Sequence, residues 1–273
     1  MGPDQTRRLI PEIGFRSERV VHRACREVRD RDAYTVVADP ANLVYRWGNY
    51  LQLTGLPVEV GVLEAAFAAE LPASWPRCAF AWNDDLAGTT TAALAGQFTP
   101  AGYRIERWIC LTVTPAALVA PGPATDVGVR PVVTDAEWAA ATANQHACRD
   151  DPLAVTDGRM AACRRAVAAG AGYWMGAFDR AGRLVGDCGV FWHGPLARFQ
   201  AVGVAPDVRG RGIAGTLVAA TVAAAEAAHP AGQYVILTGA NAPPAASTND
   251  SVSCRSRSTS APAADPRKAR CGH

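Results

Sequence analysis

The stretch from Arg198 to Ala228 reads RFQAVGVAPDVRGRGIAGTLVAATVAAAEAA and places three kinds of segment in succession. An apolar run over 199–204 predicts a strand, and Pro206 marks a polar turn after it. A loop of alternating Arg and Gly follows over 209–212, and an Ala/Val/Leu-rich helix is expected from Ile213. Backbone N–H groups at the start of a helix have no partner inside it. The succession therefore predicts a binding site for an anion.

The loop matches the pattern R-x-x-G-x-A at Arg209, Gly212 and Ala214. Gly210 and Gly212 have no Cβ, so an anion can approach the backbone closely. Arg209, Arg211 and the dipole of the following helix add positive charge. A match of six residues is equally typical of a Gly-rich turn before a core helix, so the surrounding segments must decide between the two interpretations.

The chain before the loop predicts two helices and then an antiparallel meander. Thr134 and Glu137 have the spacing of a capping box, which predicts a helix that starts between them. A second helix is expected over 159–169. Three strands are expected over 172–178, 184–192 and 197–204, with turns at 179–182 and 193–195.

Two other nucleotide-binding motifs fit less well. A P-loop needs a lysine after its last glycine, and the one lysine of the chain is Lys268. Gly210, Gly212 and Gly215 have the spacing of a dinucleotide-binding loop. That site also needs a βαβ unit and an acidic residue after its second strand, and a meander is not such a unit.

The ordered set of meander, Gly/Arg loop and helix resembles the GNAT superfamily of N-acetyltransferases over about 127–238. Within it, VGVAPDVRGRGIAGTLV is similar to the acetyl-CoA motif R/Q-x-x-G-x-G/A. The first half, with WGNYLQL at 47–53, resembles a subgroup in which a degenerate GNAT-like domain precedes the active one. The resemblance implies tandem α/β domains with a mixed, largely antiparallel sheet flanked by helices. It also implies acetyl transfer from acetyl-CoA to an amine by direct attack.

The resemblance assigns roles to two short segments and implies no metal. Backbone groups of the strand end are expected to hold the pantetheine arm like an added strand, at Val202, Gly203 and Val204. The loop and first helical turn are expected to hold the pyrophosphate, at Arg209, Gly210, Arg211, Gly212, Ile213, Ala214, Gly215 and Thr216.

The catalytic base is less well indicated. Acetyl transfer needs a group that takes a proton from the amine, directly or through water. Asp187 lies in the apolar run LVGDCGVFW and is one candidate, although a hydrogen-bonded structural aspartate is more common in such a run. His193 precedes Gly-Pro and is expected in a loop, and Cys188 is expected to be a buried thiol.

Composition limits the partners. The 273 residues carry a net charge of +2, so no strong field indicates nucleic acid or a membrane surface. The eight cysteines have no C-x-x-C spacing, and we find no signal peptide, so we expect reduced thiols in the cytoplasm. The predicted acceptor is a small-molecule or peptide amine.

We expect an accessory domain over 1–114, a Pro/Ala-rich linker over 115–125, the GNAT domain over 126–239 and a disordered tail over 240–273. The charged residues 1–33 predict a peripheral element. The first domain is expected to shape the acceptor site or a homodimer interface. For Trp47, Asn49 and Tyr50, the sequence does not separate packing between domains from lining a substrate cleft.

The tail lacks a residue that the resemblance implies, a tyrosine that protonates the leaving thiolate. Asn241 and Ala245 are similar to the Asn and Ala that begin the expected motif, but no Tyr or Phe follows. Read one base out of frame, suitable codons for 245–255 encode Arg-Val-Tyr-Glu-Arg-Leu-Gly-Phe-Leu-Pro-Val, which is the missing motif. We infer a one-base slip near Pro243, with a natural disordered tail as the alternative. A protein altered in this way could bind coenzyme A without turnover, which is the alternative function.

Overall fold

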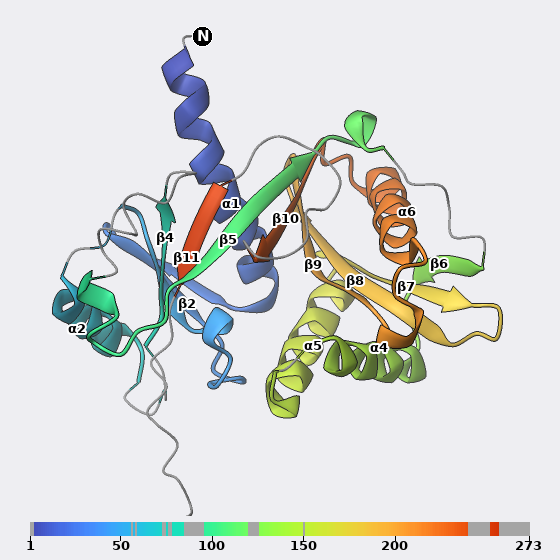
Figure 1. Ribbon diagram of the computed structural model, residues 1–273, viewed down its shortest axis with the longest axis horizontal. Helices are drawn as coiled ribbons and strands as arrows, with labels where there is room; N and C mark the ends of the chain where they lie inside the picture. Colours follow the sequence, from blue (N-terminus) through green and yellow to red (C-terminus); the bar gives the residue numbers. More distant parts are fainter. Residues whose placement is uncertain are drawn as a thin grey trace, which may run out of the picture.

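The computed structural model describes residues 3–55, 57, 59–72, 75, 78–84, 96–119, 126–149, 151–239 and 252–256. Within them one mixed sheet of eleven strands runs through the molecule in the order β1-β2-β3-β4-β11-β5-β10-β9-β8-β7-β6 (Figure 1). The strands are mostly antiparallel, and helices flank the sheet, as the sequence predicts. No helix of this described part is both long and apolar enough to cross a membrane.

The first half of the chain contributes two helices and five strands. Their bounds are α1 Pro3–Cys25, β1 Glu27–Asp30, β2 Tyr34–Ala38, β3 Tyr50–Leu53, α2 Val60–Glu70, β4 Phe80–Asp84 and β5 Glu106–Val113. The apolar side chains Leu63 and Phe67 of α2 pack on Phe80 and Trp82 of β4. This burial gives the first half a core of its own.

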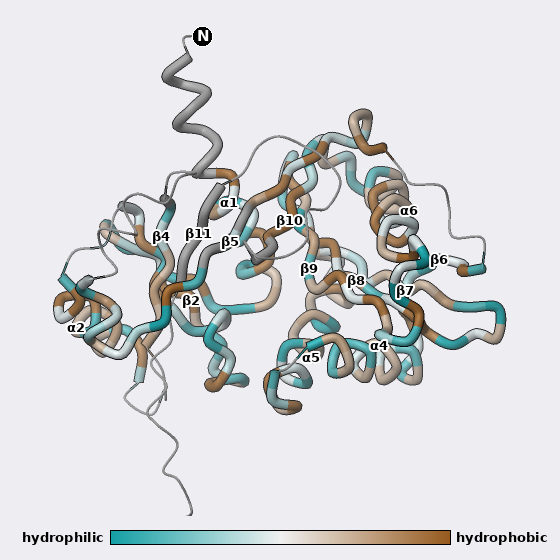
Figure 2. The backbone as a smooth tube through the Cα atoms, viewed as in Figure 1, coloured by the Kyte–Doolittle hydropathy of each residue, from teal (hydrophilic) through white to brown (hydrophobic). Residues whose placement is uncertain are grey.

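The second half forms a three-layer sandwich. Its elements are β6 Val127–Pro131, α4 Asp135–Cys148, α5 Leu153–Ala168, β7 Gly172–Asp179, β8 Leu184–His193, β9 Leu196–Val204, α6 Ile213–Ala228 and β10 Gln233–Gly239. Alternate residues of these strands face opposite layers: Trp174 packs with α4 and α5, and Met175 packs with α6. Figures 1 and 2 show α6 on one side of these strands and α4 and α5 on the other.

The two halves share the sheet through β5 and β10. β10 pairs antiparallel with β5 from Tyr234 to Gly239, but it pairs parallel with β9 only over 233–235. Beyond Val235 the ladder between β9 and β10 ends. The sheet therefore opens at this point, next to the residues predicted to hold the pantetheine arm.

The N-terminal helix is not the peripheral element that its charge pattern predicts. Val20 and Val21 of α1 are buried in the same core cluster as Met160 of α5 and Phe191 of β8. The charged residues of α1 alternate with an apolar stripe, and that stripe packs on the second half of the chain. Residues of α1 are thereby brought next to β9.

Five residues of the tail form a strand, which differs from the expectation of a tail without structure. β11 (Val252–Ser256) pairs antiparallel with both β4 and β5. Strand pairing uses backbone N–H and C=O groups, so a segment poor in apolar residues can still fill the space between two strand edges. The rest of 240–273 and most of the predicted linker lie outside the described residues, and the predicted domain boundaries stay predictions.

Candidate functional site

The Gly/Arg loop has the geometry that an anion site requires. Gly210 and Gly212 have φ angles of 78° and 77°, the left-handed region that favours glycine. An added Cβ at either position would meet no atom within 4 Å, so the space above the loop is open. The Arg209 Nε donates to the carbonyl oxygen of Val204 at 3.0 Å, which ties the loop to the end of β9.

Helix α6 starts without a side-chain cap, unlike α4. Gly212 is the N-cap of α6 and offers no side-chain acceptor to the first helical turn. At the start of α4, Thr134 and Glu137 form the predicted capping box, and backbone N–H groups of Thr134 and Val133 lower the pKa of Glu137 to about 2. The first N–H groups of α6 thus remain available to a ligand, whereas those of α4 are partly satisfied.

A cavity of about 330 Å³ lies at this loop. Its lining includes most of the residues predicted for the cofactor: Val202, Gly203, Val204, Arg209, Gly210, Gly212, Ile213 and Ala214, with Cys148 and Val208 in addition. Three predicted residues do not line it. Arg211 forms an ion pair with Asp126 away from the cavity, Gly215 lies further along α6, and the Thr216 hydroxyl donates to the Gly212 carbonyl at 3.3 Å.

A second cavity of about 370 Å³ begins where the first ends, because Val202 lines both. Its walls come from α1, the loop before β3, the junction of α4 and α5, and the diverging ends of β9 and β10. Ile236 and Leu237 of β10 and Phe199 and Ala201 of β9 are among the lining residues. The second cavity thus includes the part of the sheet where β9 and β10 are no longer paired.

Strand β9 bulges in this part of the sheet. Asp187 of β8 pairs with Gly203, but Gly189 pairs with Gln200, so one residue of β8 faces two of β9. Ala201, inside the bulge, has a φ of 53°, which is uncommon for a residue with a side chain. The Gln145 Nε2 of α4 donates to the Ala201 carbonyl oxygen at 2.7 Å and holds the bulge in place.

Asp187, the predicted candidate base, is buried beside the bulge. Its carboxylate accepts hydrogen bonds from Asn144 Nδ2 at 2.5 Å, Gln145 Nε2 at 3.1 Å and Trp174 Nε1 at 2.7 Å. Burial raises its pKa to about 6, although these hydrogen bonds act in the opposite direction. Asp187 lines neither cavity. The placement favours a role in positioning Gln145 and β9, and proton abstraction by this carboxylate stays a prediction.

The remaining candidate residues occupy structural positions: a buried thiol, a surface histidine and core aromatic side chains. Cys188 is buried, its sulfur is 3.4 Å from the Thr221 hydroxyl, and burial raises its pKa to about 12. His193 is exposed at the end of β8. Trp174 and Phe191 are core residues. Among the described residues no group of three side chains is placed to hold a metal ion.

The first half of the chain contributes residues to the second cavity that the sequence did not single out. His22 of α1 and Tyr50 of β3 line it, and the His22 Nε2 is 2.7 Å from the Tyr50 hydroxyl. Burial lowers the pKa of His22. Arg26 lies 3.2 Å from the other ring nitrogen of His22. A histidine in a charged helix gives no signal by itself, because only the packing of α1 against β9 brings it here.

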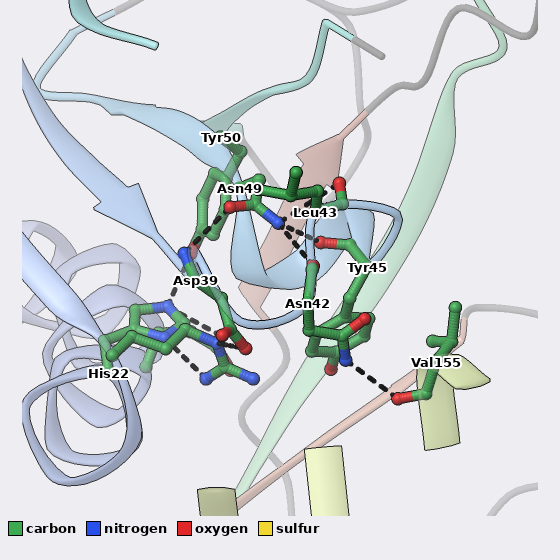
Figure 3. Close-up of polar contacts among 10 residues, drawn as sticks. His22, Asp39, Asn42, Leu43, Tyr45, Asn49, Tyr50 and Val155 are labelled. Carbon is green, nitrogen blue, oxygen red and sulfur yellow. Dashed lines mark hydrogen bonds and ion pairs between the residues drawn. The ribbon is translucent and has the colours of Figure 1, made fainter. Parts of the chain in front are cut away.

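The loop before β3 is held by one buried amide, as Figure 3 shows. The Asn49 side chain accepts from the Asp39 N–H at 2.8 Å and donates to the carbonyl oxygens of Asn42 and Tyr45 at 2.9 Å. Asn42 in turn donates to the Val155 carbonyl of α5 at 2.9 Å. Three residues of the first half were singled out from the sequence. Trp47 and Tyr50 line the second cavity, and Asn49 orders the loop.

Comparison with solved structures places this architecture among known folds. A GCN5-related N-acetyltransferase from Kribbella flavida aligns over 95% of this chain and 96% of its own, with a TM-score of 0.59 and 14% identity. A functionally unknown conserved protein from Staphylococcus epidermidis aligns over 85% and 92%, with a TM-score of 0.64 and 11% identity. A tandem GNAT protein from the clavulanic acid biosynthesis pathway covers 84% and 80%, with a TM-score of 0.50 and 15% identity.

No family model matches the sequence, and no curated protein is similar to it in sequence. The structural matches establish the fold: the chain has the fold of the GCN5-related N-acetyltransferases over most of its length. The fold class predicted from the Gly/Arg loop and its flanking segments is confirmed.

Proposed function

We propose that the protein is an N-acetyltransferase that moves an acetyl group from acetyl-CoA to an amine. The observation that carries the proposal is the pair of cavities that meet at Val202. One lies at an open Gly/Arg loop, the other lies between the two halves, and both are lined by Val202, near the point where β9 and β10 stop pairing. A long, thin cosubstrate with an anionic end and a reactive end fits this arrangement.

The residues of the loop suit the anionic end of acetyl-CoA. The uncapped N–H groups after Gly212 and the guanidinium of Arg209 supply hydrogen bonds and positive charge to a pyrophosphate. The β9 backbone over 202–204 has no β10 partner, because their pairing ends earlier. It can therefore hydrogen-bond the amide groups of a pantetheine arm as an added strand would.

The bulge at Ala201 lies where the reactive end of such a molecule would reach. Acetyl-CoA supplies the acetyl group as a thioester. The amine nitrogen forms a bond to the acetyl carbon, the carbon–sulfur bond breaks, the amine gives up a proton, and the thiolate takes one. The products are an amide and free coenzyme A. The bulge and its clamp, Gln145, fix the backbone at this point before the reaction, which is the positioning that such a transfer needs.

In this proposal the second cavity holds the amine, and we call it the acceptor cavity. We propose His22 and Tyr50 as the groups that move protons in it. They line it, and they are joined by a hydrogen bond of 2.7 Å. Burial lowers the pKa of His22, so its ring is neutral near pH 7. Arg26 donates to its Nδ1, so Nε2 carries the ring proton and donates to the Tyr50 hydroxyl oxygen. The first half of the chain thus supplies the acceptor cavity in this proposal, as one of the two roles expected for it.

Two measurements test the function. Acetyl-CoA is expected to raise the melting temperature, because a ligand that binds only the folded form adds about 2.7 kcal/mol of stability at a hundred times its Kd. Incubation with acetyl-CoA and a panel of primary amines is expected to release free thiol. Stabilisation without thiol release supports the alternative, a protein that binds coenzyme A without turnover, and the absence of both effects contradicts the proposal.

A further inference from the structure

Two arginines face the acceptor cavity with no described carboxylate close enough to form an ion pair. Arg149 follows the last residue of α4, Arg159 lies in α5, and both line the cavity. The Arg149 Nε is 3.3 Å and the Arg159 Nη2 is 3.2 Å from the same atom, the Oε1 of Gln145. This oxygen is uncharged. In the described part of the chain no carboxylate lies within 4.0 Å of either guanidinium.

The other arginines of this cavity are neutralised. Arg198 pairs with Glu18 at 2.6 Å, and Arg46 pairs with Glu106 at 2.8 Å. Arg26 has Asp39 at 4.0 Å. The contrast singles out Arg149 and Arg159 as the pair without a carboxylate at ion-pairing distance among the described residues, although Asp151 acts on Arg149 and Asp187 on Arg159 from further away.

The guanidinium of Arg159 is buried, which is unusual for a charged group that has no carboxylate at ion-pairing distance. It is only 4% exposed, and its Nε has no hydrogen-bond partner among the described residues. A buried charged group without partners is costly unless another molecule supplies them. Arg149 is exposed at the edge of the cavity, and desolvation followed by the charge of Arg159 lowers its pKa. A buried and an exposed guanidinium side by side form a site that a dissolved anion can enter.

Gln145 connects this pair to the reacting end of the cavity. Its side-chain oxygen accepts hydrogen bonds from both arginines, and its side-chain nitrogen donates to the carbonyl oxygen of Ala201 at the bulge. An anion bound by the pair therefore lies one amide side chain away from the bulge. A single small molecule can place an anionic group on the arginines and an amine near the bulge.

We propose that Arg149 and Arg159 bind a carboxylate of the acceptor, so that the acceptor is a small amine that carries a carboxylate. Two guanidinium groups present paired N–H donors that match a carboxylate or a phosphate. Asp151 also lines this wall and adds one negative charge, which favours a singly charged carboxylate over a doubly charged phosphate. This inference rests on the proposed acetyl transfer.

The first test compares amines that differ only in the terminal group. β-Alanine, β-alaninamide, propylamine and aminoethylphosphonate share a two-carbon spacer, and alanine with alaninamide repeats the comparison on a shorter one. Thiol release from acetyl-CoA is expected to have a kcat/KM about 10- to 100-fold higher for the carboxylates than for the matched amides. A higher rate for the phosphonate than for the carboxylate overturns the choice of carboxylate.

The second test uses Arg149→Gln and Arg159→Gln, with Arg159→Lys to keep the charge if the Gln variant is unstable. Each Gln variant is expected to lose the preference for carboxylate over amide, mainly through KM, while stabilisation by acetyl-CoA is unchanged. The matched control is Arg164→Gln, on the surface of the same helix, where Arg164 pairs with Asp135. It is expected to keep the preference.

The outcomes separate this inference from the proposed function. Turnover of amides and carboxylates at equal rates overturns the inference and leaves acetyl transfer standing. If no amine is acetylated, the proposed function fails, and the melting temperature becomes the readout. Stabilisation of the wild type by β-alanine, but not by β-alaninamide and not in Arg159→Gln or Arg149→Gln, then still supports the anion site. Equal stabilisation by the acid and the amide overturns it.

Discussion

The side-chain nitrogen of Gln145 lies 2.7 Å from the carbonyl oxygen of Ala201, the residue at which β9 leaves its regular pairing with β8. The same nitrogen is 3.1 Å from both carboxylate oxygens of Asp187, and the side-chain oxygen faces Arg149 and Arg159. One fully buried amide thus joins a strand bulge, a buried acid and two arginines that have no carboxylate within 4.0 Å among the described residues. Each group is positioned by the others.

Replacing this amide is expected to impair both stability and turnover. Gln145→Leu leaves the Ala201 carbonyl and one side of Asp187 without their donor, and an unsatisfied buried polar group costs about 1–3 kcal/mol. Denaturant unfolding is expected to show a loss of this size, and kcat is expected to fall because the bulge is no longer held. Thr142→Ala, one turn earlier on α4, is the control and is expected to change neither strongly. An unchanged kcat in Gln145→Leu contradicts the assigned role.

Gly212→Ala and Gly182→Ala form a matched pair. Both glycines have left-handed φ angles, 77° and 83°, and an added Cβ at either meets no atom within 4 Å. The backbone strain is therefore the same in kind, and we expect each variant to lose about 1 kcal/mol of stability without ligand. Urea unfolding of the two proteins side by side measures this. A much larger loss in one of them would mean that contacts other than φ decide its stability.

The Gly/Arg loop shows how far the sequence reaches. Its strand, turn and helix were predictable because each has a local signal, and α6 begins at the predicted Ile213. Most of the predicted loop residues line the cavity for the same reason. Arg211 is the exception among the charged ones, since its partner Asp126 is distant in sequence and no local pattern announces the pair.

The acceptor cavity was mostly beyond prediction. Its residues come from α1, the loop before β3, α5 and two strands, and only the tertiary packing brings them together. Local charge gave a wrong result for α1, because the pattern of surface charges hid the apolar stripe that packs on β9. Likewise β11 has no hydrophobic signal, because its pairing depends on the open edges of β4 and β5.

The buried acid predicts a characteristic dependence on pH. The pKa of Asp187 is about 6 in the folded protein and 3.8 ordinarily, so between these values the folded form binds the proton more strongly than the unfolded chain. This group therefore lowers stability as the pH rises from about 4 to 6, by about 2–3 kcal/mol. The stability advantage of the wild type over Asp187→Asn is expected to shrink across that range.

The control for this pH series is Asp179→Asn. The backbone N–H of Arg183 and other hydrogen bonds lower the pKa of Asp179, so its stabilising effect is present above its ordinary pKa and lost in acid. The wild-type advantage over this variant is thus expected to grow as the pH rises. Urea unfolding at several pH values checks both trends, and parallel trends in the two variants would contradict the assignment.

The contact between Asn42 and α5 depends on a glycine. A Cβ at Gly158 would lie 2.6 Å from the Asn42 Nδ2, so Gly158→Ala is expected to push Asn42 away from the Val155 carbonyl. We expect a loss of about 1–2 kcal/mol in the free energy of unfolding and a higher KM for the acceptor. Gly61→Ala, in α2 with no atom within 4 Å, is expected to be neutral or slightly stabilising. Equal effects in both would argue against the contact.

A calorimetric titration of acetyl-CoA into the wild type, Gly212→Ala and Gly182→Ala tests directly whether the Gly/Arg loop binds this cosubstrate. We predict one site per chain in the wild type and in Gly182→Ala, with at least a tenfold weaker affinity in Gly212→Ala. Such a difference, about 1.4 kcal/mol, follows if the loop and the first turn of α6 hold the pyrophosphate. Equal affinity in all three proteins, or no binding by the wild type, would contradict a pyrophosphate site at this loop.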